Sequence, residues 1–147
     1  MSMERQRAIE QIIRGDRFAV HLGAVIEAIE PGYARASLTV GAEMLNMHGT
    51  THGGVIQTLA DVVFAAASNS HGQTSVALDI TTSFLRATHA GDRLVAEARE
   101  VHTTHRTGLY EITVTLAETG QPVARSQATV YRRDHWFVPP EGQGSAS

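Results

Sequence analysis

Residues 53–70 carry the longest helical pattern in this chain. Apolar side chains recur there at three- and four-residue spacings, which places them on one stripe of a helix. The stripe comprises Ile56, Leu59, Ala60, Val63, Ala66 and Ala67, and the opposite face carries Gly54, Thr58, Asp61, Ala65 and Ser68. His71-Gly72 supplies a stop signal. The pattern predicts one long helix with an apolar face and a face of small or polar residues.

The rest of the chain is patterned mainly as strands. Residues 33–40 alternate between apolar and polar side chains, and with the apolar stretch 22–30 they predict a hairpin around Pro31-Gly32. Four further strand-like stretches follow the long helix, at roughly residues 75–86, 93–102, 108–117 and 122–132. A short amphipathic helix is expected near the N-terminus, over residues 3–14. This order predicts an α+β fold in which a mostly antiparallel sheet packs against the single long helix.

The 147 residues suit one domain. We expect an N-terminal helical segment over residues 1–20, a folded domain over residues 21–133 and a disordered tail over residues 134–147, which is rich in Pro, Gly and Ser. The charged N-terminus lacks the apolar core of a signal peptide, and no apolar run reaches the roughly 18 residues of a membrane helix. The sequence therefore predicts a cytoplasmic protein without a membrane partner.

Composition and missing motifs exclude several kinds of chemistry. The chain has no cysteine, which rules out disulfides, thiolate metal sites and cysteine nucleophiles. Its net charge of −3 disfavours nucleic acid as a partner. The G-x-S-x-G elbow and the glycine motifs of nucleotide-binding loops are absent. His48 and His52 are spaced four apart, but Gly49 and two threonines between them argue against a helix that would align them on a metal. We expect no metal and no cofactor.

Asp61 is the charged residue that the long helix carries among apolar and small side chains. Taken alone, it is compatible with an ordinary solvated helix face. Two features favour a functional role: its neighbours on that face are small enough for close packing, and the same helix begins at Gly53-Gly54. The first turn of a helix has free N–H groups and the positive end of the helix dipole, which together bind an oxyanion well. A donor site and a carboxylate therefore lie on one element.

The segment from Leu45 to Asp61 resembles the motif of the hotdog-fold acyl-CoA thioesterases, and most closely the PaaI-type branch associated with phenylacetate degradation. The matching positions are Leu45, Asn46, His52, Gly53, Gly54, Leu59, Ala60 and Asp61, with further matches at Asn69-Ser70, Phe84-Leu85-Arg86 and Ala90-Gly91-Asp92. The resemblance covers residues 20–133. It departs from the branch at Ala87-Thr88, where that branch usually has Pro-Gly.

The resemblance implies a sheet wrapped around the central helix and a role for each matched residue. Gly53 would supply an oxyanion N–H, Asp61 would act as base or nucleophile, Asn46 would orient water or substrate, and His52 would support the helix start. From the residues alone, Gly53 and Asp61 are eight positions apart, or roughly 12 Å along a helix, so one helix cannot present both to one carbonyl. Two antiparallel helices from two copies of the chain can present Gly53 of one copy and Asp61 of the other to the same carbonyl. This predicts a homodimer with composite sites, and the resemblance implies a homotetramer.

The expected reaction is hydrolysis of an acyl-CoA, with aryl-acetyl-CoA thioesters such as phenylacetyl-CoA as the expected substrates. Basic residues should meet the phosphates of CoA, and the candidates are Arg86, Arg106 and Arg132 with Arg133, of which Arg106 is preferred because it lies in a turn. For each arginine the alternative is a solvated surface charge. For the acyl group, apolar side chains at Phe64 and around Asn46 are candidates. Thioesterases for medium-chain or aroyl-CoA, a hotdog hydratase and a non-catalytic acyl-CoA-binding module are the alternatives. The hydratase is disfavoured because no Asp closely precedes His52.

Overall fold

The computed structural model describes residues 1–142, which form three helices, one short 3-10 turn and six strands. In chain order the elements are α1 (Met3–Ile13), α2 (Arg17–Leu22), β1 (Val25–Glu30), β2 (Tyr33–Thr39), η1 (Ala42–Met44), α3 (Gly53–Asn69), β3 (Gln73–Phe84), β4 (Arg93–Thr103), β5 (Thr107–Leu116) and β6 (Pro122–Trp136). The long helix and the four strands after it lie within a few residues of their predicted positions. No helix in the described part of the chain is long and apolar enough to span a membrane.

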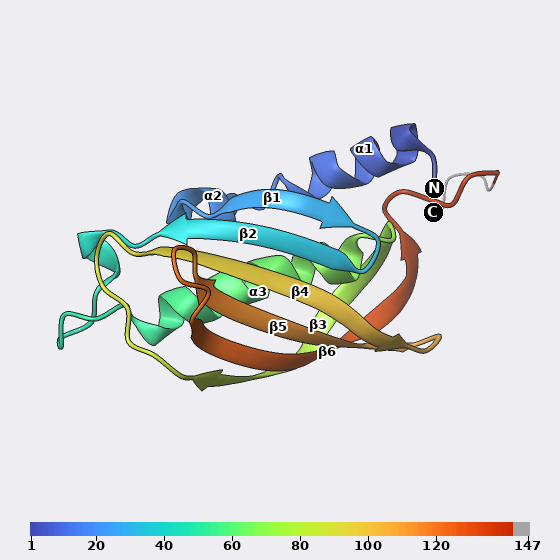
Figure 1. The fold of residues 1–147 in the computed structure, drawn as a ribbon. Helices are drawn as coiled ribbons and strands as arrows, with labels where there is room; N and C mark the ends of the chain where they lie inside the picture. The colour runs from blue at the N-terminus through green and yellow to red at the C-terminus, as the bar shows by residue number, and fades with distance from the viewer. Residues whose placement is uncertain (143–147) are drawn as a thin grey trace.

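The six strands form one sheet that curves around α3 (Figure 1). Every pairing is antiparallel, and the strand order is β1-β2-β4-β5-β6-β3. The chain leaves β2, crosses the concave face of the sheet as α3, and returns as β3 at the far edge beside β6. The pattern predicts this α+β arrangement, and it is the hotdog fold that the resemblance implies.

The core lies between α3 and the concave face of the sheet. All six residues of the predicted apolar stripe are buried, because alternate side chains of the strands point toward the helix and cover them. Phe64 is also fully buried, with its ring edge-on to that of Tyr110 at a centroid distance of 5.7 Å. On the opposite face Gly54, Asp61 and Ala65 are exposed. Ser68 differs from the prediction, since it is buried and its hydroxyl donates to the Ala65 carbonyl.

The N-terminal segment contains a second helix that the sequence pattern did not separate from its surroundings. Asp16 caps α2 by accepting a hydrogen bond from the Ala19 N–H at 3.0 Å. Gly23 ends α2 with a φ of +90°, a conformation that favours glycine. The first strand consequently begins at Val25 and not at Leu22, where the apolar stretch starts.

Residues 134–142 are attached to the body of the protein. The strand β6 continues to Trp136, so the predicted boundary after residue 133 falls inside it. The N–H groups of Phe137 and Val138 then donate to the Gly72 carbonyl. The Arg5 guanidinium donates to the carbonyls of Val138 and Pro139, which connects α1 to this segment. The remainder of the predicted tail, residues 143–147, lies outside the described residues.

Candidate active site at the start of α3

The start of α3 leaves one backbone N–H free. His52 is the N-cap residue, and its Nδ1 accepts the Gly54 N–H at 2.9 Å. Among residues 1–142 no acceptor is bonded to the N–H of Gly53. The first turn of a helix also carries the positive end of the dipole. Gly53 can therefore donate to a bound oxygen, while His52 fixes the conformation of the turn without competing for that donor.

The side chain of Asn46 organises the loop before α3. Its Oδ1 accepts the N–H groups of His48 and Thr50, at 2.9 and 3.2 Å, and its Nδ2 donates to the Thr50 hydroxyl at 3.0 Å. The Asn46 N–H donates to the Thr50 carbonyl at 2.8 Å and the Gly49 N–H donates to the Asn46 carbonyl at 3.1 Å, which closes the same turn. The bond from the His48 N–H to Oδ1 forms an Asx turn, and the bond from Nδ2 to Thr50 occupies the other polar atom of the amide. Within one chain, Asn46 shapes the approach to the helix start.

A buried pair of threonines anchors this loop to the segment after β3. The Thr88 hydroxyl donates to that of Thr51 at 2.7 Å, and the Thr51 N–H donates to the Thr88 carbonyl at 2.8 Å. Both residues are buried. Thr88 belongs to the Ala87-Thr88 position where the sequence departs from the resembling branch. Thr88 therefore contributes a contact that holds the two walls of the site together. The sequence alone did not reveal this contact.

A pocket of about 370 Å³ opens between these two segments. The Gly53 backbone forms part of its lining, Phe84 and Leu85 contribute apolar side chains, and Arg86 lies in the same lining. A Cβ placed on Gly53 would lie 3.5 Å from the Phe84 ring, which shows how closely that ring approaches the helix start. Phe84 and Leu85 are each about half exposed. The pocket offers one backbone donor, an apolar wall and one guanidinium.

Asp61 lies eight residues further along α3, on the face that the sheet leaves open. Partial desolvation by its surroundings raises the pKa of Asp61, and the nearby carboxylate of Asp16 raises it further. A carboxyl whose pKa is raised holds its proton more readily and is a stronger base when ionised. The helical rise separates it from Gly53 by roughly 12 Å, so these two groups do not meet within one chain.

Arg106 lies away from this pocket. It belongs to the turn between β4 and β5, at the end of the sheet opposite the start of α3 (Figure 1). Its guanidinium pairs with Asp134 at 3.0 Å and contacts the Tyr131 hydroxyl. Of the predicted arginines, only Arg86 lines the pocket with Gly53.

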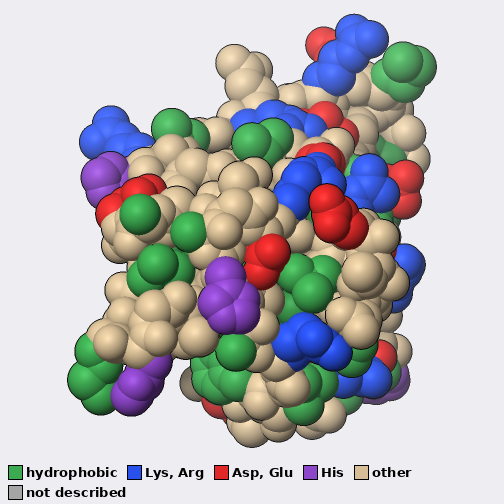
Figure 2. Space-filling view, turned by 60° about the vertical axis from the view of Figure 1, so that its left-hand side comes forward, with side chains coloured by type: hydrophobic (Ala, Val, Ile, Leu, Met, Phe, Trp, Pro, Cys, Tyr) green, Lys and Arg blue, Asp and Glu red, His purple; other side chains and the backbone are tan. Residues whose placement is uncertain are grey.

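The end of the molecule where α3 starts exposes hydrophobic and histidine side chains together, with basic and acidic groups interspersed (Figure 2). No group of three or more His, Asp or Glu side chains is placed to share a metal ion in residues 1–142.

Comparison with known proteins agrees with this architecture and site. A family model described as the thioesterase superfamily matches residues 48–123, which include Gly53 and Asp61. The acyl-coenzyme A thioesterase PaaI of Escherichia coli K12 is 40% identical over 114 residues, covering 78% of this chain and 81% of that protein.

Solved structures extend this likeness over most of the fold. The E. coli PaaI protein from the phenylacetic acid degradation operon superposes with a TM-score of 0.85 at 35% identity, covering 92% of this chain and 97% of that one. A mutant of the phenylacetic acid degradation protein PaaI from Thermus thermophilus gives 0.77 at 39% identity, covering 80% and 100%. The smu.793 protein of Streptococcus mutans UA159, solved bound to acetyl CoA, gives 0.72 at 30%, covering 75% and 88%.

The fold and the family match define the class of this protein as a thioester hydrolase. The chain belongs to the thioesterase superfamily, and within it the protein is similar to the PaaI thioesterases.

Proposed function

We propose that this protein hydrolyses acyl-CoA thioesters, with aryl-acetyl-CoA compounds such as phenylacetyl-CoA as its preferred substrates. The observation that carries the proposal is that one helix, α3, presents both a free N–H at Gly53 and an exposed carboxylate at Asp61. The aryl-acetyl preference is supported by the similarity to PaaI proteins, one of which comes from a phenylacetic acid degradation operon. That a relative was solved with acetyl CoA supports CoA as the thiol part of the substrate.

In the proposed reaction, the thioester carbonyl oxygen accepts the Gly53 N–H as it becomes an oxyanion. One such donor contributes on the order of 3 kcal/mol to transition-state stabilisation. Asp61 either takes the proton from an attacking water or attacks the carbonyl carbon itself, forming an anhydride that water then cleaves. The carbon–sulfur bond breaks and the CoA thiolate leaves. The proton released by the attacking water passes to the thiolate, by way of Asp61 or solvent, and Asp61 returns to its ionised form. The products are the free carboxylic acid and CoA. A thiolate is a good leaving group, so the site needs no strong general acid.

Such a site needs a second copy of the chain, because Gly53 and Asp61 of one helix are too far apart. The two edges of the sheet differ in how they could accept that copy. At β1, the side chains of Gln6 and Arg14 from the α1 segment donate to the carbonyls of Ile29 and Ile26. At β3, by contrast, the side chains of residues 76–79 are exposed. An open edge with apolar side chains such as Val76 and Leu78 readily pairs with another strand.

We therefore propose a homodimer in which β3 pairs with β3 of the second copy across a two-fold axis. Antiparallel pairing would lay the two α3 helices side by side in opposite directions, so that Gly53 of one faces Asp61 of the other. Arg106 would then approach the second copy's α3 start, where it could meet CoA together with Arg86. The resemblance supports further assembly into a homotetramer. Light scattering distinguishes the monomer, dimer and tetramer masses.

Thiol release from a panel of acyl-CoA substrates tests the proposed function. The panel should contain acetyl-, octanoyl-, benzoyl-, phenylacetyl-, hydroxyphenylacetyl- and palmitoyl-CoA. We expect phenylacetyl- or hydroxyphenylacetyl-CoA to give the highest kcat/KM, and Asp61→Asn to abolish most of the turnover while CoA binding persists. Higher efficiency with octanoyl- or benzoyl-CoA would favour the medium-chain or aroyl alternatives. Binding of acyl-CoA without thiol release from any member would identify a binding module instead.

A further inference from the structure

A polar pocket lies at the end of α3 opposite Gly53, near the place where the two ends of the chain meet (Figure 1). It has a volume of about 450 Å³. The charged and aromatic residues of its lining are Arg5 of α1, His71 of the turn after α3, Arg132 and Trp136 of β6, and Glu141. Arg132, one of the arginines considered for contact with CoA, therefore lines this pocket and not the pocket that contains Gly53.

The guanidinium group of Arg5 is fixed in position without being neutralised. Its Nε donates to the Pro139 carbonyl at 3.0 Å, and its Nη2 donates to the carbonyls of His71 and Val138, each at 2.8 Å. These bonds leave Nη1 without an acceptor among residues 1–142. The guanidinium carbon lies 6.0 Å from the centre of the Trp136 ring. Carbonyl acceptors orient a cation but, unlike a carboxylate, do not cancel its charge.

The guanidinium group of Arg132 is held in the same way. Its Nη1 donates to the Thr104 carbonyl at 2.7 Å, and its Nη2 donates to the side-chain oxygen of Gln73 at 2.9 Å. No salt bridge involves Arg5 or Arg132 within residues 1–142. One acceptor of each arginine comes from the segment where β3 begins, since His71 and Gln73 are two residues apart. The two cations are thus anchored at neighbouring positions, and neither charge is compensated.

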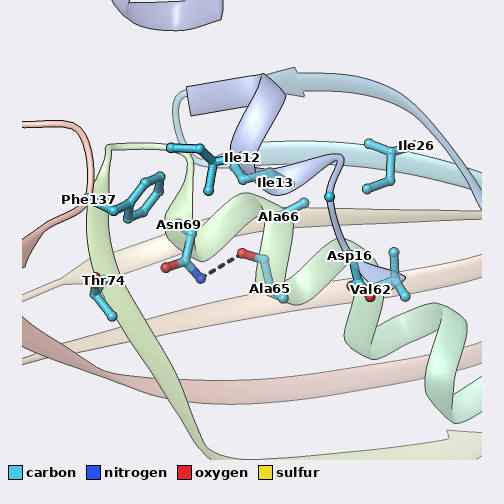
Figure 3. Close-up of a pocket in the computed structure, with 11 residues that line it drawn as sticks. Ile12, Ile13, Asp16, Ile26, Val62, Ala65, Ala66, Asn69, Thr74 and Phe137 are labelled. Carbon is cyan, nitrogen blue, oxygen red and sulfur yellow. Dashed lines mark hydrogen bonds between the residues drawn. The ribbon is translucent and has the colours of Figure 1, made fainter. Parts of the chain in front are cut away.

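The C-terminal wall of the pocket is attached to the body of the protein. The N–H groups of Phe137 and Val138 donate to the Gly72 carbonyl at 3.0 and 3.2 Å. The Phe137 side chain lines an apolar cavity beside α3, toward the same end as Ile12 and Asn69 (Figure 3). Because these contacts hold the wall before a ligand arrives, less conformational entropy is lost when a ligand binds.

Glu141 shows that this pocket attracts negative charge. Its Oε1 accepts the N–H of Ser2 at 2.8 Å. That bond lowers the pKa of the Glu141 carboxyl, and the positive charge of Arg5 lowers it further. An environment that favours the ionised form of this carboxylate favours an external anion too. The side chain of Glu141 is exposed, so an anion from solution can displace it.

We propose that this pocket binds the phosphate groups of a small phosphorylated molecule between Arg5 and Arg132, in competition with Glu141. Guanidinium groups form strong, charge-assisted hydrogen bonds with phosphate oxygens. Because the two guanidinium groups come from different elements, α1 and β6, a ligand with several phosphate oxygens can engage both, whereas a single carboxylate is a poorer bridge. The inference does not rest on the proposed hydrolysis, since it needs neither Gly53 nor Asp61.

The fluorescence of Trp136 reports on this pocket, because Trp136 is the only tryptophan of the chain and lines the pocket. The full-length protein is titrated with inorganic pyrophosphate at constant ionic strength, since salt screens exposed charges, and calorimetry gives the stoichiometry. We expect saturable binding with a Kd of about 1 mM or tighter. Acetate at the same ionic strength should bind at least about 10-fold more weakly. The absence of saturable pyrophosphate binding, or equal binding of acetate, would overturn the proposal.

Charge-matched variants locate the bound pyrophosphate. Arg132→Gln should weaken binding by about 10-fold or more, whereas Arg125→Gln, at an exposed position of the same strand, should leave the Kd within about twofold. Glu141→Gln should tighten binding by at least about threefold because the competing carboxylate is lost, and Glu118→Gln, in the turn between β5 and β6, should not change the Kd. Both glutamates are exposed, so their variants test the proposal even if Arg132→Gln disturbs the fold. Equal effects of a variant and its control would indicate general charge attraction and would refute the pocket.

Kinetics separate this pocket from the substrate site. Pyrophosphate at a concentration that saturates the Trp136 signal should leave KM for acetyl-CoA within about twofold. A competitive rise in KM, with an inhibition constant equal to the Kd from fluorescence, would place the pocket in the substrate site and would overturn the proposal. If the protein hydrolyses no acyl-CoA, the proposed function fails, while the fluorescence titrations still decide whether this pocket binds phosphate.

Discussion

Proline at Gly53 is the sharpest available test of a composite site. Gly53 is the first residue of α3, a position where proline is well tolerated because its missing N–H has no partner in the helix. The preceding residue, His52, has φ −61° and ψ 134°, which suits a residue before proline. A Cβ at this position would lie 3.5 Å from Phe84, an ordinary contact. Gly53→Pro should therefore fold and lose only the donor.

The expected magnitudes follow from the symmetry of the proposed dimer. Loss of one oxyanion donor should lower kcat by roughly 10² to 10³-fold, and Asp61→Asn should lower it by about 10² to 10⁴-fold. In a mixed dimer, the Asp61→Asn chain supplies an intact Gly53 to the Asp61 of its partner, so one of the two sites is complete. Random 1:1 reassociation makes about half of the dimers mixed, and the pool should regain about one quarter of wild-type activity.

The assay is thiol release after the two variants are unfolded together and refolded, with differently tagged chains to purify the mixed dimers. Each variant refolded with itself serves as the control. Inactive mixed dimers of verified composition would show that Gly53 and Asp61 do not complete a site across the interface. A Gly53→Pro homodimer with kcat close to wild type would remove the Gly53 N–H from the mechanism.

Further predictions concern pH, stability and substrate length. Desolvation raises the pKa of Asp61, and the carboxylate of Asp16 raises it further. Asp16→Asn keeps the helix cap but removes that charge. It should therefore lower the pKa of Asp61 and shift the acid limb of kcat/KM to lower pH. The raised pKa disfavours the ionised carboxylate in the folded state, so Asp61→Asn should raise Tm slightly at pH 7, and this gain should disappear as the pH falls below the ordinary carboxyl range. Thr88→Val should cost roughly 1–3 kcal/mol in urea unfolding, because it leaves the buried hydroxyl of Thr51 without its donor; the exposed Thr39→Val is the control. Phenylacetyl-CoA should be hydrolysed at least about tenfold more efficiently than palmitoyl-CoA; equal turnover would refute the aryl-acetyl assignment but not the thioesterase class.

The fold was predictable because its main elements have strong periodic patterns. The apolar stripe of α3 lies on one face over about three turns, and the sequence of β2 alternates between apolar and polar residues, so burial against one core dictates both. Ser37 departs from the alternation, because it is buried with its neighbours Ala36 and Leu38. The N-terminal region was predicted less well. Its second helix is six residues long and depends on the Asp16 cap and on Gly23, which are local signals easily absorbed into the apolar stretch that follows.

The candidate site was only partly predictable, because its walls come from segments that are distant in sequence. Gly53 and Asp61 are recognisable from one helix, but the Thr51–Thr88 pair joins residues 37 positions apart. For Phe64, the sequence suggested a role that the structure does not support. Its position one turn after Asp61 suggested a substrate contact, yet packing against Tyr110 places it in the core. Ile12 and Phe137, by contrast, line one cavity beside α3 although they lie near opposite ends of the chain. Helical periodicity therefore places the candidate residues Gly53 and Asp61, whereas the walls around them depend on tertiary packing.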